Sequence, residues 1–397
     1  MVTYAREMST PTFDPETPLP GPPDPWASTS QPSRRDRPPY HMTDMIDAEP
    51  SLAERIVARL ADPGSSAGEL ARAVTAATRA GEPVVVTGCG TSEHAAQAVA
   101  AILGDGADSA QAFELSLRPP SRGLVLAVSH EGATTATNAA LSAARSAGAR
   151  TALITVSGRS PGATLADIVV ETEELDQGWC HTVGYVSPIV AAAVVAAHIA
   201  GERVDASFGA AIRGCMAAGQ SRSSEAEWIA RALADAREIL VIASGSDRPA
   251  GRELVLKIEE GAWMRAAYRD LESFLHGHLA ATDDHTGLVL ILTDRDARAG
   301  RVARARAALA AARVIGIRSA AIVADGVRAD LAADLTPGGR IVVPDAPALA
   351  APVAAILGSA IPLQLLTERL ARVRGVDPDP IHRDVEAYRH AAEVAEG

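Results

Sequence analysis

The stretch Val84–Ala95, with the sequence VVVTGCGTSEHA, decides the fold of this chain. Its β-branched apolar residues predict a strand that ends at Gly88, and the alanine-rich residues that follow, with apolar positions three and four apart, predict a helix. The glycines between them allow backbone N–H groups to approach a ligand, and the positive end of the helix dipole favours an anion. The stretch indicates either a site for a phosphate or polyhydroxylated molecule, or an ordinary strand-to-helix connection in an α/β domain.

Strands and helices alternate along the rest of the chain, in an order that occurs twice. Apolar strands are predicted in two series, at 84–88, 124–128, 151–156 and 167–172, and again at 238–246, 288–293, 319–324 and 340–344. Helices between such strands imply parallel βαβ units with right-handed crossovers. The sequence therefore predicts an α/β fold of two tandem, doubly wound parallel-sheet domains, at residues 40–215 and 216–375.

The two ends of the chain differ from this pattern. Residues 1–39 are rich in Pro and Ser and have almost no apolar periodicity, so we expect a disordered tail that cannot bury enough surface to offset its ordering entropy. Residues 376–397 form a C-terminal tail. A helix is expected from His41 onwards, with a break at Pro50.

The composition narrows the class of protein. Of the 397 residues 47% are hydrophobic, which is enough for a large core, and the formal net charge of −12 argues against a general nucleic-acid partner. We expect no membrane span, because the best candidate, around Ile189, is short and interrupted by polar residues. Cys89, Cys180 and Cys215 lie too far apart for a disulfide framework or a zinc site, so we expect no metal, no cofactor and a cytoplasmic protein.

Candidate ligand-binding residues follow the strands of the first series. In doubly wound sheets, ligands bind beyond the carboxyl ends of the strands. The candidates come from the loop after 84–88 and from the loop SHEGATT after 124–128, and they are Cys89, Gly90, Thr91, Ser92, Ser129, His130, Glu131 and Thr134. Hydroxyl side chains just before a helix either cap it or donate to an anion, and two such loops side by side favour a shared site.

These motifs resemble those of the sugar isomerase (SIS) domain family. The resemblance rests on GCGTS after a strand, on Ser-x-x-Gly-x-Thr at the start of a helix, and on GWCHTVGY at 178–185, which adds His181 and Thr182 to the candidate binding residues. The segment KIEEGAWMRAAYRDLESFLHG at 257–277 and the closing helix PLQLLTERLARVRG are similar to the isomerase half of the glucosamine-6-phosphate synthases. The resemblance covers nearly everything after residue 40 and implies two tandem SIS domains.

The resemblance also implies a mechanism and an assembly. Glu260 matches a glutamate that moves a proton between C1 and C2 of an open sugar, Lys257 matches a lysine beside it, and His276 matches a histidine implicated in ring opening. In the family a second subunit contributes this histidine, which implies a homodimer. Lys257 and Glu260 are three residues apart and therefore share a helix face, where they are either an acid-base group with its cation or a surface ion pair.

The sequence departs from the family pattern at three places. Glu131 and His181 stand where the family has serines, and a carboxylate at 131 repels a phosphate dianion unless His130 or an arginine offsets it. A substrate that carries an amine at this position is the alternative. The C-terminal tail has no lysine, so His382 or Arg383 takes the place of the family's lysine, or Tyr388 does, or that chemistry is absent.

The sequence therefore predicts an isomerase or deaminase of an amino-sugar or keto-sugar phosphate that uses an enediol-type proton transfer. No cysteine precedes Cys89, so we expect no glutamine hydrolysis and at most the use of free ammonia. The expected partner is a small-molecule sugar or sugar phosphate. The alternatives are a fructosamine-type deglycase and a non-catalytic sugar-phosphate-binding regulatory protein.

Overall fold

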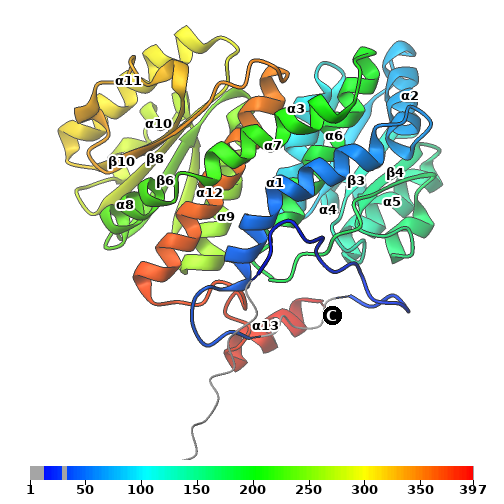
Figure 1. The fold of residues 1–397 in the computed structure, drawn as a ribbon, viewed down its shortest axis with the longest axis horizontal. Coiled ribbons are helices and arrows are strands. Elements are labelled where there is room, and N and C mark those ends of the chain that lie inside the picture. The colour runs from blue at the N-terminus through cyan, green and yellow to red at the C-terminus, as the bar shows by residue number, and fades with distance from the viewer. Residues whose placement is uncertain (1–12, 29–33, 397) are drawn as a thin grey trace, which may run out of the picture.

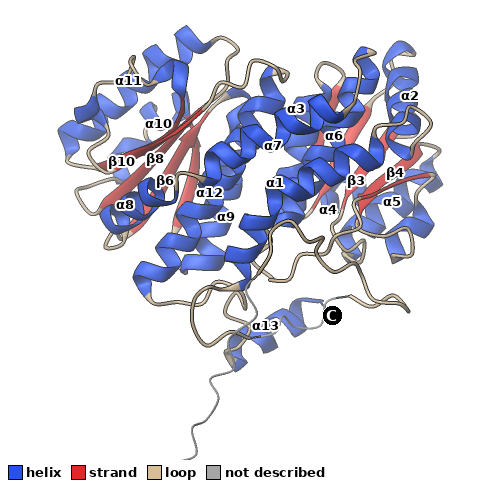
Figure 2. Cartoon of the chain, in the orientation of Figure 1, coloured by secondary structure: helices blue, strands red, loops and turns tan. Residues whose placement is uncertain are grey.

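The computed structural model describes residues 13–28 and 34–396, which form two five-stranded parallel sheets with helices between and around them. Figure 1 shows the two halves of the chain side by side, and Figure 2 shows one sheet in each half. Helices α1, α3, α7, α9 and α12 lie between the sheets. The two halves therefore share their central helical layer.

The first half contains the elements up to residue 200. They are α1 (His41–Leu60), α2 (Ser66–Arg79), β1 (Val84–Gly88), α3 (Thr91–Leu103), β2 (Ala107–Gln111), α4 (Ala112–Leu117), β3 (Leu124–Val128), α5 (Thr135–Ala147), β4 (Arg150–Thr155), the 3₁₀ helix η1 (Pro161–Leu165), β5 (Ile168–Glu171) and α6 (Val183–Ala200).

The second half contains the remaining elements. They are α7 (Ala206–Gln220), α8 (Ser223–Leu233), β6 (Glu238–Ala243), η2 (Gly245–Asp247), α9 (Arg248–Ala262), β7 (Ala266–Asp270), α10 (Leu271–Leu275), η3 (His278–Ala281), β8 (Thr286–Leu292), α11 (Arg298–Ile315), β9 (Arg318–Ala324), η4 (Asp325–Val327), η5 (Ala333–Leu335), β10 (Gly339–Val343), α12 (Ala351–Arg374) and α13 (Glu386–Glu396).

The two sheets have the same topology, which confirms the predicted pair of doubly wound α/β units. The strand order is β2-β1-β3-β4-β5 in the first sheet and β10-β9-β8-β6-β7 in the second, and every pairing between neighbours is parallel. Read in chain order within each half, both sheets run second, first, third, fourth and fifth strand. The predicted domain limits stay a prediction, and the limit between 215 and 216 falls inside α7.

Three local predictions differ from the structure. Helix α1 continues through Pro50 instead of breaking there, because buried side chains on both sides of the proline hold it against α6 and α7. The sequence pattern predicts a helix over 253–266, but α9 ends at Ala262, since Trp263 adopts a left-handed conformation with φ of 54°. Strands β2 and β7 lie at the sheet edges and are only partly buried, so they have no apolar run that the sequence pattern reveals.

Two helices are long and apolar enough to cross a membrane by length and composition alone. They are Val183–Ala200, longer than the sequence pattern indicates, and Ala351–Arg374, and their most apolar windows are 78% and 89% buried inside the protein. Both helices pack within the core cluster that the two halves share. Their apolar character is therefore that of core helices.

The described part of the N-terminal segment differs from the expected disordered tail. Residues 13–28 lie along the first half, where Leu19 is buried and its N–H donates to the Glu174 carboxylate at 2.8 Å. Arg55 holds the same carboxylate with two hydrogen bonds of 2.7 Å. These contacts fix the segment even though it has no apolar periodicity, and the remaining part of that expectation, 1–12 and 29–33, lies outside the described residues.

The C-terminal tail contacts the first turn of α1. Tyr40, the residue before α1, does not cap the helix with its side chain. The buried Asp379 carboxylate does so instead, because it accepts the N–H groups of His41 at 2.8 Å and Met42 at 2.9 Å. A carboxylate also interacts favourably with the positive end of the helix dipole.

We expect Asp379→Ala to loosen both the tail and the start of α1. Loss of a capping side chain costs about 1–2 kcal/mol, so thermal unfolding should begin at a lower temperature and amide hydrogen exchange should speed up in the first turn of α1. Asp384→Ala is the matched control, because Asp384 makes only a 3.5 Å ion pair with the exposed Arg34. Equal exchange rates in the two variants would show that Asp379 is not the cap.

Candidate active site

The loop between β1 and α3 makes a tight turn, and two glycines allow this turn. A side chain at Gly88 would place its Cβ 2.4 Å from the backbone oxygen of Ser92, so only glycine allows the chain to turn this closely. Gly90 has φ of 57° and immediately precedes α3, where Thr91 is buried and Ser92 is partly exposed. Strand β1 lies between β2 and β3, which is the switch point of this topology, where doubly wound sheets bind ligands.

The loop after β3 lies beside the β1–α3 loop, and hydrogen bonds of His130 fix its conformation. The His130 carbonyl accepts the Val156 N–H at 2.9 Å and the Thr155 hydroxyl at 3.0 Å. Its ring Nε2 accepts the Asp176 N–H at 2.9 Å, so in the neutral ring the proton resides on Nδ1. Burial lowers the His130 pKa to about 3, and His130 therefore provides no positive charge to offset the half-buried Glu131 carboxylate.

The segment 176–184 places a second imidazole, that of His181, beside the His130 ring. The Asp176 carboxylate accepts the N–H groups of Thr182 at 2.8 Å and Gly184 at 3.1 Å, which fixes the turn before α6. The His181 ring then lies 5.5 Å from the His130 ring. Enclosure by protein, together with the Lys257 ammonium, lowers the His181 pKa to about 4, so both imidazoles are uncharged at neutral pH.

Helix α9 presents a row of charged side chains to the first half. Lys257 is fully buried and is the only lysine in the sequence. Its ammonium lies 2.6 Å from Glu260 Oε2 and 3.6 Å from Glu253 Oε1. His94 of α3 reaches Glu253 through its Nδ1 at 2.8 Å, so an α3 side chain from the first half completes the row.

The charges in this row stabilise one another. Burial opposes the ionisation of Glu253, but Lys257 and hydrogen bonds from His94 and Thr91 outweigh it and hold the Glu253 pKa below its ordinary value. Burial likewise disfavours the Lys257 ammonium, yet the neighbouring carboxylates raise its pKa, so it remains charged. Burial raises the Glu260 pKa, although Lys257 opposes this shift. Glu260, with a side chain 25% exposed, is the member of the row that reaches towards solvent.

The C-terminal tail lies against the C-terminal end of α9. The His382 ring stacks between Trp263 and Tyr388, with centroid distances of 3.6 and 4.3 Å. The Arg383 guanidinium lies 4.8 Å from the centre of the Trp179 ring, two residues before His181. His382, Arg383 and Tyr388, the candidates for the place of the family's lysine, therefore all make ring contacts in this region. Arg383 also contributes a positive charge that lowers the His181 pKa.

His276 is not brought to this site within one chain. It follows α10 and is exposed, and its Nε2 lies 2.7 Å from Glu272 of the same short helix. Glu272 also pairs with Arg304 of α11. Across residues 13–28 and 34–396, no hydrogen bond or ion pair links His276 to Lys257 or Glu260.

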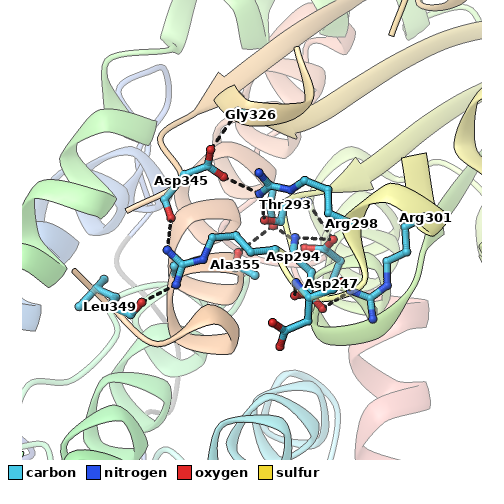
Figure 3. Close-up of polar contacts among 12 residues, drawn as sticks. Asp247, Thr293, Asp294, Arg298, Arg301, Gly326, Asp345, Leu349 and Ala355 are labelled. Atoms are coloured by element: carbon cyan, nitrogen blue, oxygen red, sulfur yellow. Dashed lines mark hydrogen bonds and ion pairs between the residues drawn. The ribbon is translucent and has the colours of Figure 1, made fainter. Parts of the chain in front are cut away.

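The corresponding edge of the second sheet carries charged side chains that pair with one another. Figure 3 shows Asp247 beneath this edge, where its buried carboxylate accepts the N–H groups of Thr293 at 2.8 Å and Asp294 at 3.1 Å. Arg298 pairs with Asp345 beside them. The duplicated units therefore differ in the side chains at this edge, because the first sheet edge has hydroxyl-lined loops and the second has ion pairs.

Sequence reasoning placed Thr91, Lys257 and Glu260 in one site, and the structure brings α3 and α9 together there. It missed His94 and Glu253, although each has a signal. Glu253 precedes Lys257 by one helical turn, and His94 follows Thr91 by three residues, so each pair shares a helix face.

Within the described ranges no group of three His, Cys, Asp or Glu side chains is arranged to hold a metal ion.

Comparison with known proteins finds a match to the SIS domain in part of the chain. Residues 82–197 match the SIS domain model. The glutamine–fructose-6-phosphate aminotransferase (isomerizing) of Gloeobacter violaceus is 27% identical over 320 residues, which are 75% of this chain and 50% of that protein. The chain thus spans about half the length of this curated relative.

Solved structures share the fold at low sequence identity. The C-terminal domain of the glucosamine-fructose-6-phosphate aminotransferase of Francisella tularensis has a TM-score of 0.75 and 19% identity, and covers 87% of this chain and 99% of its own. The tagatose-6-phosphate ketose/aldose isomerase of Escherichia coli has a TM-score of 0.71 and 19% identity, with 89% and 98% covered. Residues 82–197 therefore match the SIS domain, and the chain has a fold that resembles the C-terminal domain of the aminotransferase.

Proposed function

We propose that the chain is an isomerase or deaminase of a sugar phosphate or amino-sugar phosphate. The observation that carries this proposal is the buried Lys257, whose ammonium holds Glu260 at 2.6 Å on a helix that faces the hydroxyl-lined loop of the first sheet. A carboxyl group that is partly exposed, has a raised pKa and keeps a fixed cation beside it is suited to accept and return a proton. The names of the similar proteins agree with this class of substrate.

In the proposed reaction Glu260 moves one proton between adjacent carbons of the open sugar. Its carboxylate removes the proton from the carbon next to the carbonyl, which leaves an enediolate, and the resulting carboxylic acid returns the proton to the former carbonyl carbon. The proton of the neighbouring hydroxyl group passes to the former carbonyl oxygen, so that the carbonyl and the hydroxyl exchange places. Lys257 is fully buried, so its role is to orient Glu260 and to add positive charge near the enediolate oxygen. Thr91, Ser92, Ser129 and Thr134 would bind the hydroxyl or phosphate groups of the substrate.

The assembly belongs to the same proposal. Because His276 is exposed and apart from Glu260 in its own chain, its role in ring opening requires a second copy, and we propose a homodimer in which each site takes His276 from the partner. The free thiols of Cys89, Cys180 and Cys215 are compatible with the reducing cytoplasm that we propose as its location.

Glu260→Gln should abolish most of the activity. Removal of a general acid-base group typically costs about 10²- to 10⁴-fold in rate, so kcat should fall by this order with a smaller change in KM. Isomer and ammonia would be assayed with fructose 6-phosphate, glucosamine 6-phosphate and a fructosamine phosphate. Glu259→Gln is the matched control, because Glu259 is the exposed preceding residue and should be dispensable.

The pattern of substrates separates the alternatives. Turnover of the fructosamine phosphate alone would indicate a deglycase. Turnover of none of the three substrates by the wild-type chain, or equal activity of Glu260→Gln and Glu259→Gln, would contradict the proposed catalytic role. Binding without turnover would indicate the regulatory alternative.

The activity should depend on pH through Glu260. The group must be ionised to accept a proton, and burial raises its pKa above that of an exposed glutamate. The value of kcat/KM should therefore fall as the pH is lowered through this raised pKa, and recover as the pH rises above it. A pH profile of wild-type kcat/KM tests this, and an acid limb that persists unchanged in the residual activity of Glu260→Gln would assign the limb to another group.

The reaction should proceed without a covalent imine on a lysine. Lys257 is the only lysine of the sequence, and the neighbouring carboxylates keep its ammonium protonated and therefore non-nucleophilic. Treatment with sodium borohydride in the presence of fructose 6-phosphate should leave Lys257 unmodified in a peptide map. A sugar adduct on Lys257 would show that the ammonium loses its proton during turnover.

A further inference from the structure

A second group of basic side chains lies outside the loops of the first sheet, at the carboxyl end of β6. A cleft of about 410 Å³ opens there, and we call it the arginine cleft. Its polar lining consists of Ser244, Arg248, Glu272, Arg301 and Arg304, with Gly245 between them. The lining therefore contains three guanidinium groups and one carboxylate.

The three arginines converge from two helices. Arg248 is the first residue of α9, whereas Arg301 and Arg304 lie one turn apart on α11 and so share a face. Arg248 uses its Nε for a 2.6 Å bond to Asp270, and Arg301 uses one terminal nitrogen for a 2.6 Å bond to Asp294. A guanidinium has five N–H donors, so both side chains are oriented by these bonds and keep donors for a ligand.

Gly245 allows the floor of the cleft to form. Its φ is 63°, and a Cβ at this position would lie 2.2 Å from a terminal nitrogen of Arg301. Any other residue would therefore displace Arg301 from the loop. The loop backbone also bonds to the acid behind Arg301, since the Ser246 N–H donates to Asp294 at 2.9 Å. Arg301 is thus held in a preformed position, which reduces the entropy cost of binding.

Glu272 is the acid in the lining, and it accepts hydrogen bonds from two nitrogens of Arg304 at a place that is open to solvent. The side chains of this pair are 58% and 38% exposed, and exposed ion pairs contribute little stability. Glu272 also bonds to His276 at 2.7 Å, so it keeps a partner when Arg304 turns to a ligand. A ligand with two negative charges competes well for Arg304, because guanidinium groups bind phosphate oxygens in pairs.

We propose that the arginine cleft is a second anion site, which binds the phosphate of a small phosphorylated molecule. Arg248, Arg301 and Arg304 hold the phosphate oxygens, and Glu272 is displaced from Arg304 on binding. The cleft has the size of sites that bind small ligands, so it accommodates the organic part of a phosphate monoester as well as inorganic phosphate. This site belongs to the second sheet and is separate from the loops of the first.

Titration calorimetry at constant ionic strength tests the proposal on the full chain, with inorganic phosphate and glucose 6-phosphate as separate probes. Arg248→Ala and Arg304→Ala should each weaken one binding event by about tenfold or more, because each removes charged hydrogen bonds. Arg306→Ala is the matched control, since Arg306 lies on the same helix but pairs with Asp330 outside the cleft. It should bind both probes as the wild type does.

Glu272→Gln provides a result that a misfolded protein cannot imitate. Removal of the competing carboxylate should tighten the same binding event, by up to about fivefold on the scale of an exposed ion pair. Stronger binding of glucose 6-phosphate than of inorganic phosphate assigns the site to a phosphate monoester, and the reverse assigns it to free phosphate. The proposal is overturned if the wild type binds neither probe, or if the arginine variants and Glu272→Gln all bind like the wild type.

Discussion

The position of Lys257 between two carboxylates is the constraint on which the rest of the site depends. A buried ammonium is tolerated only when carboxylates surround it, and here Glu253 and Glu260 lie 3.6 and 2.6 Å away. Removing one partner of such a buried group typically costs about 3–5 kcal/mol, because the other charge is left without compensation. His94 on α3 bonds to Glu253, so a side chain of the first half helps to stabilise the buried Glu253 carboxylate of the second half. The contact fixes how the two halves face each other where Glu260 emerges.

The duplication of the fold does not duplicate the site. Both sheets have the same strand order, and both have a glycine loop after their first strand. In the first half the loops carry hydroxyl groups and neutral imidazoles. In the second half Asp247 and the pairs Arg298–Asp345 and Arg301–Asp294 occupy the equivalent edge (Figure 3). Helix α9 begins at this edge and packs against α3 of the first half, so the second unit contributes its helix to the candidate site.

The sequence predicted the repeated α/β order because strand cores and helix faces follow from local hydrophobic periodicity. It also predicted Lys257 and Glu260 on one helix face, since a spacing of three residues fixes their relation. It did not predict the edge strands β2 and β7, whose side chains are half-exposed and lack an apolar run. It placed a break at Pro50, where packing on both sides of α1 outweighs the lost backbone hydrogen bond. The order of residues 13–28 was missed for a similar reason, because polar contacts with Glu174 fix them.

By itself the sequence determined the class of fold, its duplication and the residue types available for sugar chemistry, because these depend on local periodicity and on short motifs. Only the tertiary structure decided which of these residues meet. It brought His94 to Glu253 across 159 positions of sequence and the Asp379 carboxylate to the start of α1 across more than 300. It also left His276 exposed, with its hydrogen bond to Glu272 of α10 and not to Lys257 or Glu260. Such pairings depend on how two packed sheets share one helical layer. The energy of that packing comes from many contacts between residues far apart in sequence, so a local sequence pattern does not predict it.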